Sequence, residues 1–200
     1  MEQKIRTENS NELVKKSPRL PMGQHLVQNF PVLDLGFQPD FNEKTWQLKV
    51  YGEVKEPKTF SYSELLKLPK SYLTSDFHCV TSWSRFDVKW AGVKFLDLLK
   101  IVKPLDRAKF VVFECADDYT TNVHLDELKK DNVIIAYELE GKPVPQEHGW
   151  PLRPIIPSLY GWKSAKFLRA IRFMEKDEAG YWEVRGYHNH GDPWKEERYS

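Results

Sequence analysis

Proline and glycine cut this chain into short segments. Its 200 residues include 13 prolines and 10 glycines, and a proline ends or kinks a helix because it lacks an amide hydrogen and fixes its φ angle. No segment repeats at a fixed period, and no alternation of strand and long helix of the βαβ type recurs. The sequence therefore predicts one mixed α+β domain, rich in strands and with short helices.

Several segments between these breaks have strand patterns. Alternating apolar and polar residues predict a half-buried strand over residues 46–50. Near-continuous apolar runs over 109–115 and 132–139 predict strands that are covered on both faces. Two further extended segments are expected over 152–156 and 167–174.

Two short helices are predicted between the strands. Ser61 and Glu64 have the spacing of a capping box, and Pro69 ends the helix that follows. A second helix is expected over residues 95–102, where leucine, phenylalanine and valine cover one broad face before Pro104.

The N-terminal composition and the overall charge limit the partners of the chain. Residues 1–25 are polar and without periodicity, which predicts a flexible arm before a domain over residues 26–200. No signal peptide is recognisable, and no window approaches the about 18 apolar residues of a membrane span. Lys plus Arg number 30 against 29 Asp plus Glu, and two cysteines cannot form a disulfide framework. We expect a cytoplasmic protein that binds neither nucleic acid nor membranes.

One stretch of the chain is basic although the total charge is balanced. Residues 148–174 contain five Lys or Arg and no Asp or Glu. Arg153, Ser164 and Lys166 are of the types that bind phosphate oxygens, which indicates an anion site. A solvated basic edge strand is an equally good interpretation of the charge pattern alone. The common glycine-rich nucleotide loops, H-E-x-x-H, C-x-x-C and G-x-S-x-G are absent from the sequence.

Cys79 lies in the segment that is densest in reactive side chains. Its neighbours His78 and Arg85 could lower the pKa of the thiol, which would favour a nucleophile or a metal ligand. A small buried core residue is the commoner role of a lone cysteine, and Cys115 is expected to have that role. In an extended strand His78 and Cys79 point to opposite faces, so they are not expected to share one zinc ion.

A third segment, residues 182–192, holds Tyr187, His188 and His190. The two histidines could share a face and bind a metal, but two unrelated loop histidines are the commoner case. Tyr187 could donate a proton or serve as an aromatic anchor for the C-terminal segment.

Taken in order, these segments resemble the molybdopterin-binding domain of the sulfite oxidase family, and within it the small stand-alone bacterial members. The resemblance covers most of the chain, from about Asn29 to Trp194. Several motifs in the correct order are far more specific than any one of them. The motifs are Trp46-x-Leu48-x-Val50, Gly52-x-Val54, Pro57, Glu64-Leu65, Leu68-Pro69, Cys79-Val80-Thr81-x-Trp83-Ser84, Asp117-x-Tyr119-Thr120-Thr121-Asn122, His148-Gly149-x-Pro151-x-Arg153, Gly161-x-Lys163-Ser164-Ala165-Lys166 and Trp182 to Tyr187.

The resemblance implies a molybdenum cofactor with one pterin dithiolene, and the Cys79 thiolate as a direct metal ligand. Soft sulfur ligands suit a metal that changes its oxidation state during oxygen-atom transfer. By the same resemblance Tyr187 and Arg85 would orient the substrate. After the cysteine the animal and plant enzymes have a Gly-Asn-Arg type of segment that is missing here, so Trp83 should make the pocket more aromatic. The implied cofactor-binding residues are Asn29, Val32, Asp117 or its neighbour Thr120, His148, Arg153, Ser164, Ala165 and Lys166.

The implied activity is oxygen-atom or two-electron transfer on a small oxyanion or S-oxide. No haem-binding segment is present in the sequence, so electrons are expected to be exchanged with an external carrier or redox protein. Two alternatives remain open at this point. One is a non-catalytic module of the same fold that binds an anion or a pterin. The other is a thiol enzyme in which Cys79 acts with His78 or His124 as its base.

Overall fold

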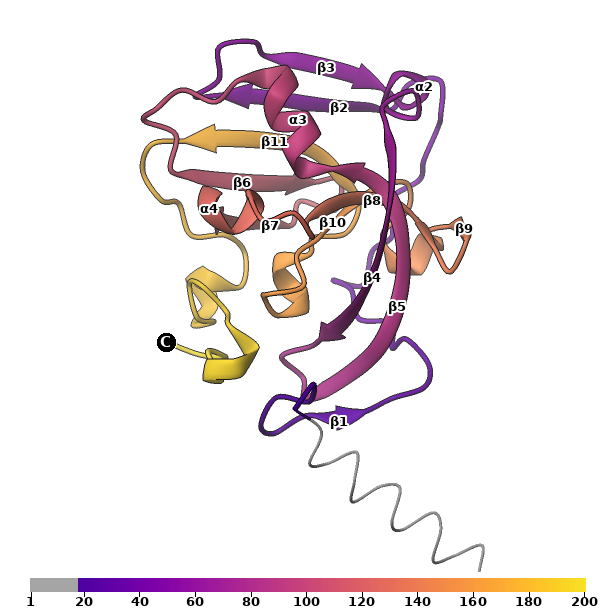
Figure 1. Ribbon diagram of the computed structural model, residues 1–200, viewed down its shortest axis with the longest axis vertical. Helices are drawn as coiled ribbons and strands as arrows, with labels where there is room; N and C mark the ends of the chain where they lie inside the picture. The colour runs from indigo at the N-terminus through magenta and orange to yellow at the C-terminus, as the bar shows by residue number, and fades with distance from the viewer. Residues whose placement is uncertain (1–17) are drawn as a thin grey trace, which may run out of the picture.

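Short strands assemble into two sheets in the computed structural model, which describes residues 18–200 (Figure 1). The first sheet has five strands in the order β3-β2-β11-β6-β7. Its central strand, β11, runs parallel to β2 and antiparallel to β6. The basic segment therefore ends in an interior strand. Its other strand, over residues 153–155, lies at the edge of the second sheet but is buried, so the interpretation as a solvated basic edge strand is wrong. The strands are β2 (Gln47–Gly52), β3 (Lys58–Ser61), β6 (Phe110–Cys115), β7 (Thr120–His124) and β11 (Leu168–Met174).

The second sheet has six strands in the order β1-β5-β8-β10, with β4 on β5 and β9 on β8. Its largest element is the antiparallel hairpin of β4 and β5, which curves along one side of the molecule (Figure 1). The end of this hairpin carries Cys79. The strands are β1 (His25–Leu26), β4 (Lys70–His78), β5 (Trp83–Lys94), β8 (Ile134–Leu139), β9 (Lys142–Pro143) and β10 (Arg153–Ile155).

The helices are short, as the sequence predicts. The Ser61 hydroxyl accepts a hydrogen bond from the Glu64 amide, and the Glu64 carboxylate accepts one from the Ser61 amide. The predicted capping box therefore starts α2 (Tyr62–Leu65). Helix α3 (Phe95–Val102) has the predicted bounds, and α4 (Leu125–Leu128) is an addition. Four 3-10 turns complete the described elements: η1 (Gln146–His148), η2 (Gly161–Lys163), η3 (Glu183–Arg185) and η4 (Pro193–Lys195). In residues 18–200 no helix has the length and apolar character needed to span a membrane.

The predicted mixed, strand-rich domain is confirmed, and all five predicted strands exist within two residues of their expected bounds. The sequence analysis missed the β4–β5 hairpin and β7. Polar residues interrupt the apolar pattern of these strands: in β4 many of them are exposed, whereas in β7 Thr121 and Asn122 are polar but buried. Cys115 is 1% exposed and belongs to the larger apolar core, as expected. Trp182 packs against this core and against the smaller one that includes Cys79.

Part of the predicted N-terminal arm lies against the domain. Residues 1–17 are outside the described residues. Arg19 forms ion pairs with Asp76 and Asp87, and the Gln24 side chain is 8% exposed and donates to the Cys79 carbonyl. In residues 18–25 the chain is therefore attached to the end of the β4–β5 hairpin, which differs from the expected boundary at residue 26.

Candidate active site

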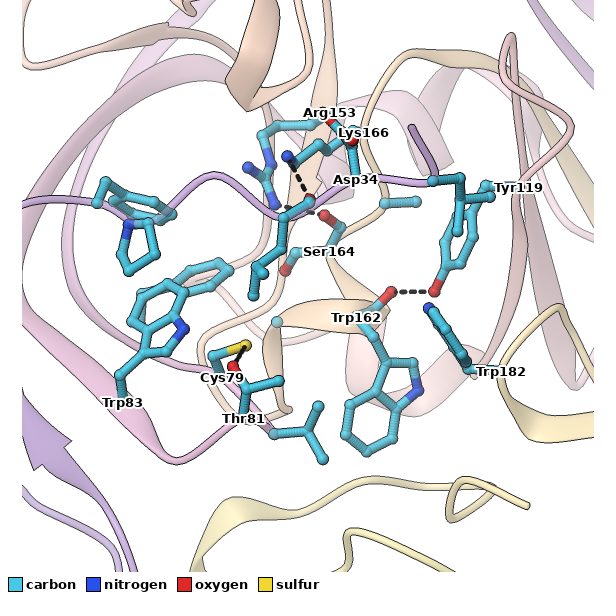
Figure 2. Close-up of a pocket in the computed structure, with 18 of the residues that line it drawn as sticks. Asp34, Cys79, Thr81, Trp83, Tyr119, Arg153, Trp162, Ser164, Lys166 and Trp182 are labelled. Atoms are coloured by element: carbon cyan, nitrogen blue, oxygen red, sulfur yellow. Dashed lines mark hydrogen bonds between the residues drawn. The ribbon is translucent and has the colours of Figure 1, made fainter. Parts of the chain in front are cut away.

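A cleft of about 290 Å³ lies where loops from both sheets meet (Figure 2). The β4–β5 turn supplies Cys79, and the β6–β7 turn supplies Asp117 and Tyr119. Because each loop begins at a strand end, the two sheets fix the positions of side chains that are far apart in the sequence. The β4–β5 hairpin also contributes Phe77, Val80, Thr81 and Trp83, and the remaining lining residues come from residues 30–35, from residues 153–166 and from the segment of Trp182 and Tyr187.

The Cys79 thiol lies on a tight turn that closes the β4–β5 hairpin. The Cys79 amide donates to the Trp83 carbonyl at 2.8 Å, and the Ser82 amide donates to the Cys79 carbonyl at 3.1 Å. Ser82 has a φ of 72°, the left-handed conformation that lets the chain reverse here. Burial raises the pKa of the Cys79 thiol, and the Thr81 hydroxyl at 3.1 Å from Sγ opposes that rise only in part. The thiol is therefore protonated at neutral pH unless a cation or metal binds it.

His78 and Arg85 do not activate Cys79. The His78 ring hydrogen-bonds the Ser84 hydroxyl at 2.8 Å, on the other side of the strand, as alternation predicts. Arg85 is on the same face of β5 as Trp83 but two residues further along, about 7 Å away. There it pairs with Glu140 at 3.1 Å. The expectation that these two residues lower the pKa of the thiol is therefore wrong.

Two cations, the buried Arg153 and the half-buried Lys166, line the opposite end of the cleft (Figure 2). The Arg153 side chain is 2% exposed and donates to the carbonyls of His148 and Ser164, while its Nε has no partner. Burial lowers the pKa of Arg153 to about 10. Lys166 donates to the carbonyls of Leu33 and Glu147, and burial lowers its pKa to about 8. Within residues 18–200 neither cation forms an ion pair with a carboxylate.

Aromatic side chains form the wall beside Cys79. The rings of Trp182 and Tyr187 stack with centroids 4.9 Å apart, and the Trp162 ring meets Tyr187 edge-on at 5.2 Å. Trp83 lines the cleft on the other side of the thiol (Figure 2). Trp83 therefore contributes an aromatic ring to the cleft lining.

A buried ion pair supports this aromatic wall. Lys163 Nζ lies 2.7 Å from Glu183 Oε1, and both side chains are almost fully buried. The same carboxylate oxygen accepts from the Trp162 indole at 2.8 Å and from the Thr121 hydroxyl at 2.9 Å. Lys163 also donates to the side-chain oxygen of Asn122. One carboxylate thus joins β7, η2 and η3 behind the cleft.

The structure brings together seven of the twelve residues predicted for the site. Two of them, Cys79 and Tyr187, lie at the thiol end. The other five lie at the cation end and on the adjoining wall: Asp117, Arg153, Ser164, Ala165 and Lys166. Burial raises the pKa of the Asp117 carboxyl, so this acid is less easily ionised than a solvated one.

The other five predicted residues do not line this cleft. Asn29, Arg85 and His148 line a second cavity of about 360 Å³, and Phe30 contributes to both cavities. Burial and the nearby Arg153 lower the pKa of His148 to about 4, so its ring is neutral. Val32 is 48% exposed, and Thr120 lies in β7 outside the cleft.

Several lining residues were absent from the sequence prediction. Trp162 and Tyr119 lie inside motifs that were used, and their aromatic character was the available signal. Leu33, Asp34 and Leu35 carry no such signal, because an irregular loop has no periodicity from which a facing direction can be read.

No histidine lines the cleft in the described part of the chain. His124 caps α4, with Nδ1 accepting from the Asp126 amide. His188 and His190 lie within 3.5 Å of Glu197 and anchor the C-terminal segment, and no cluster of metal-binding type exists within residues 18–200. A thiol enzyme with a histidine base is therefore not supported by the geometry.

The cleft fits an anionic cofactor that is bound through sulfur. The buried Arg153 has an Nε without a partner, and neither Arg153 nor the half-buried Lys166 has a carboxylate partner within residues 18–200. A negatively charged group beside them would offset the cost of these charges. A phosphate can accept from both cations. Cys79 at the other end offers a soft donor for a metal.

Comparisons with known proteins agree with this geometry. Residues 35–182 match the model of the oxidoreductase molybdopterin binding domain. The chain is 39% identical over 186 residues to the uncharacterized oxidoreductase YuiH of Bacillus subtilis, covering 92% of this chain and 94% of that protein. It is 35% identical over 153 residues to the protein-methionine-sulfoxide reductase catalytic subunit MsrP of Xanthomonas campestris, covering 68% of this chain and 47% of that protein.

The fold is also found in a solved structure. The crystal structure of the sulfane dehydrogenase SoxCD from Paracoccus pantotrophus superposes with a TM-score of 0.65 at 18% identity. That match covers 74% of this chain and 42% of the other. The chain thus spans nearly all of YuiH but about half of MsrP and of the SoxCD chain.

Proposed function

Because the chain belongs to the oxidoreductase molybdopterin-binding domain family, we propose that it reduces the S–O bond of a neutral organic S-oxide at a molybdenum centre held by Cys79. The match of residues 35–182 confirms the sulfite oxidase type of family that the ordered motifs indicated. The family and the relatives named as oxidoreductases also make the chain an enzyme, so the non-catalytic alternative is set aside.

The chain's own residues have distinct positions for this reaction. The Cys79 thiolate would bind the metal, while Arg153 and Lys166 would bind the phosphate of the pterin. When bound, the molybdenum cofactor supplies a metal that accepts and releases an oxygen atom with two electrons. Burial raises the pKa of Tyr187, so its hydroxyl stays protonated at neutral pH and can donate a hydrogen bond to the substrate oxygen.

The observation that carries the choice of substrate is the lining around Cys79. Val80, Trp83 and Trp162 surround the thiol, and Arg85 is turned away to Glu140. Both cations that line the cleft lie at its other end (Figure 2), where they would bind the pterin phosphate. A sulfite or another small oxyanion would lose its hydration without gaining a cation, which is costly. A neutral S-oxide with apolar substituents loses far less, and the name of the MsrP relative favours the same class.

The overall reaction needs a reductant that the chain does not supply. The S–O bond breaks, the sulfur gains two electrons, and the oxygen leaves as water with two protons. We propose that an external redox protein or small carrier delivers the electrons. The absence of haem from the protein and its cytoplasmic location stay predictions from the sequence.

Metal analysis and turnover test this function. Purified protein should contain about one molybdenum per chain and should reduce dimethyl sulfoxide or methionine sulfoxide with a reduced viologen dye as the electron donor. Cys79→Ala should stay folded and lose turnover. Cys115→Ala, the matched control, removes the other thiol and should keep it, because that thiol lies in the apolar core. Sulfite oxidation without S-oxide reduction would contradict the substrate class, and a metal-free protein would contradict the mechanism.

A further inference from the structure

The turn that carries Cys79 is held from behind by two distant segments of the chain. Gln24 Nε2 donates to the Cys79 carbonyl at 3.0 Å, and Arg198 Nη1 donates to the Val80 carbonyl. Neither residue lines the cleft. Both contacts lie on the backbone of the turn and leave the thiol free.

Each of these side chains is itself fixed. Gln24 is 8% exposed, and its Oε1 accepts from the Ser84 hydroxyl, which also bonds the His78 ring. The Arg198 guanidinium lies 5.1 Å from the centre of the Tyr160 ring, and its Nη2 donates to the Met22 carbonyl at 3.4 Å. The Tyr160 ring is fully buried. The two donors are therefore part of one connected layer beneath the turn.

The bonded carbonyls restrain the backbone from which the Cys79 side chain projects. A peptide group is planar, so its orientation fixes one backbone dihedral on each side of it. Gln24 orients the peptide group after Cys79, and Arg198 orients the next one. The amide of Cys79 is already fixed by the Trp83 carbonyl. With both sides of its Cα restrained, the Cα–Cβ bond of Cys79 has one direction into the cleft, and the Thr81 hydroxyl 3.1 Å from Sγ restrains the thiol itself.

We propose that Arg198 and Gln24 are positioning residues that hold the Cys79 turn in the geometry for binding the metal. The inference rests on the proposed role of Cys79. Losing Arg198 removes the side-chain donor of the Val80 carbonyl, and losing Gln24 leaves the Cys79 carbonyl with the Ser82 amide as its remaining donor, so in either case the turn opens more often. Without the cofactor this opening exposes a thiol that is 9% exposed when the turn is closed.

The test compares Arg198→Ala with a matched arginine. Arg185 also donates to a carbonyl, that of Tyr181, and its guanidinium lies 3.7 Å from the centre of a tyrosine ring, but it does not contact the Cys79 turn. In the full-length cofactor-free protein, Cys79 alkylation by iodoacetamide, located by peptide mass spectrometry, should be up to about tenfold faster in Arg198→Ala, as expected for a lost charged hydrogen bond. The Arg198 charge lowers the pKa of the Cys79 thiol, so its removal alone would slow alkylation, and an acceleration therefore reports the opening of the turn. Arg185→Ala should match the wild type, and Arg198→Lys should lie between.

A second variant and a second readout complete the test. Gln24→Met removes the other bond and should accelerate alkylation about fivefold, so it decides the question if Arg198→Ala does not fold. In the loaded protein, the thiolate-to-molybdenum absorption band should shift in the Arg198 and Gln24 variants and stay unchanged in Arg185→Ala. Wild-type alkylation rates in both variants, or an equal acceleration in Arg185→Ala, would overturn the inference. A metal-free wild type would contradict the proposed function instead, because alkylation still reports on the turn.

Discussion

Replacing Arg153 with methionine is expected to remove much of the stability that the protein gains on binding its cofactor. Arg153 is a buried cation without a carboxylate partner, and burial lowers its pKa from 12.5 to about 10. At 1.36 kcal/mol per pKa unit, keeping this charge buried costs the cofactor-free protein about 3 kcal/mol at neutral pH. An anionic group beside Arg153 would offset that cost.

In the cofactor-free protein the substitution should change stability little. The variant loses the buried charge, but it leaves the carbonyls of His148 and Ser164 without their donor, at about 1 to 2 kcal/mol each. These two effects nearly cancel. In the loaded protein the variant also loses the contact with the anion. Loading should therefore stabilise the wild type by about 3 kcal/mol more than Arg153→Met.

Thermal unfolding of the loaded and cofactor-free forms of both proteins measures this difference as a thermodynamic cycle. For a domain of this size it corresponds to about 6 to 12 °C in the gain of Tm on loading. Arg172→Met is the control, because Arg172 pairs with Glu114 and Glu178 outside the cleft. It should lower Tm equally in both forms. The reasoning is refuted if loading stabilises Arg153→Met as much as the wild type.

Two further predictions concern the lysines of the basic segment. Lys163→Met should lower the free energy of unfolding in urea by about 3 to 5 kcal/mol, because it leaves Glu183 charged and buried. The control is Lys100→Met, which removes an exposed lysine 2.7 Å from Asp97 and should cost less than about 0.5 kcal/mol. Equal losses would show that the buried pair has no special role. Sulfate should bind the cofactor-free protein more weakly as the pH rises through about 8, because the lowered pKa of Lys166 means that the cation is lost there. Calorimetry at pH 7 and pH 9 checks this, and Lys166→Met should bind weakly at both values; equal wild-type affinity would contradict it.

The strands and helices could be predicted wherever apolar periodicity or capping chemistry was local. Helix α3 and the capping box of α2 depend on residues within one or two turns, so their signals survive without tertiary context. The β4–β5 hairpin could not be predicted in the same way. Its strands alternate between buried and exposed faces with many polar residues, and its stability depends on pairing with β1 and β8.

The site was only partly predictable for a related reason. The motifs placed Cys79, Arg153 and Lys166 in one site, and the structure brings these residues to one cleft. Sequence order does not state which way a side chain points. Arg85 follows the cysteine by only six residues. It lies two residues beyond Trp83 along β5, however, so its guanidinium is over the Phe30 ring and lines the second cavity.

By itself, the sequence determined the family and the strand-rich class and predicted Cys79 as a soft metal ligand, because these depend on residue types in a fixed order. The tertiary structure decided how the charges are used. Five cations share an acid-free stretch of sequence, but Lys163 pairs with Glu183 and Arg172 with Glu114. Folding brings distant carboxylates next to some of these cations but not next to Arg153 and Lys166. The anionic group of a cofactor can then serve as the partner of these two charges.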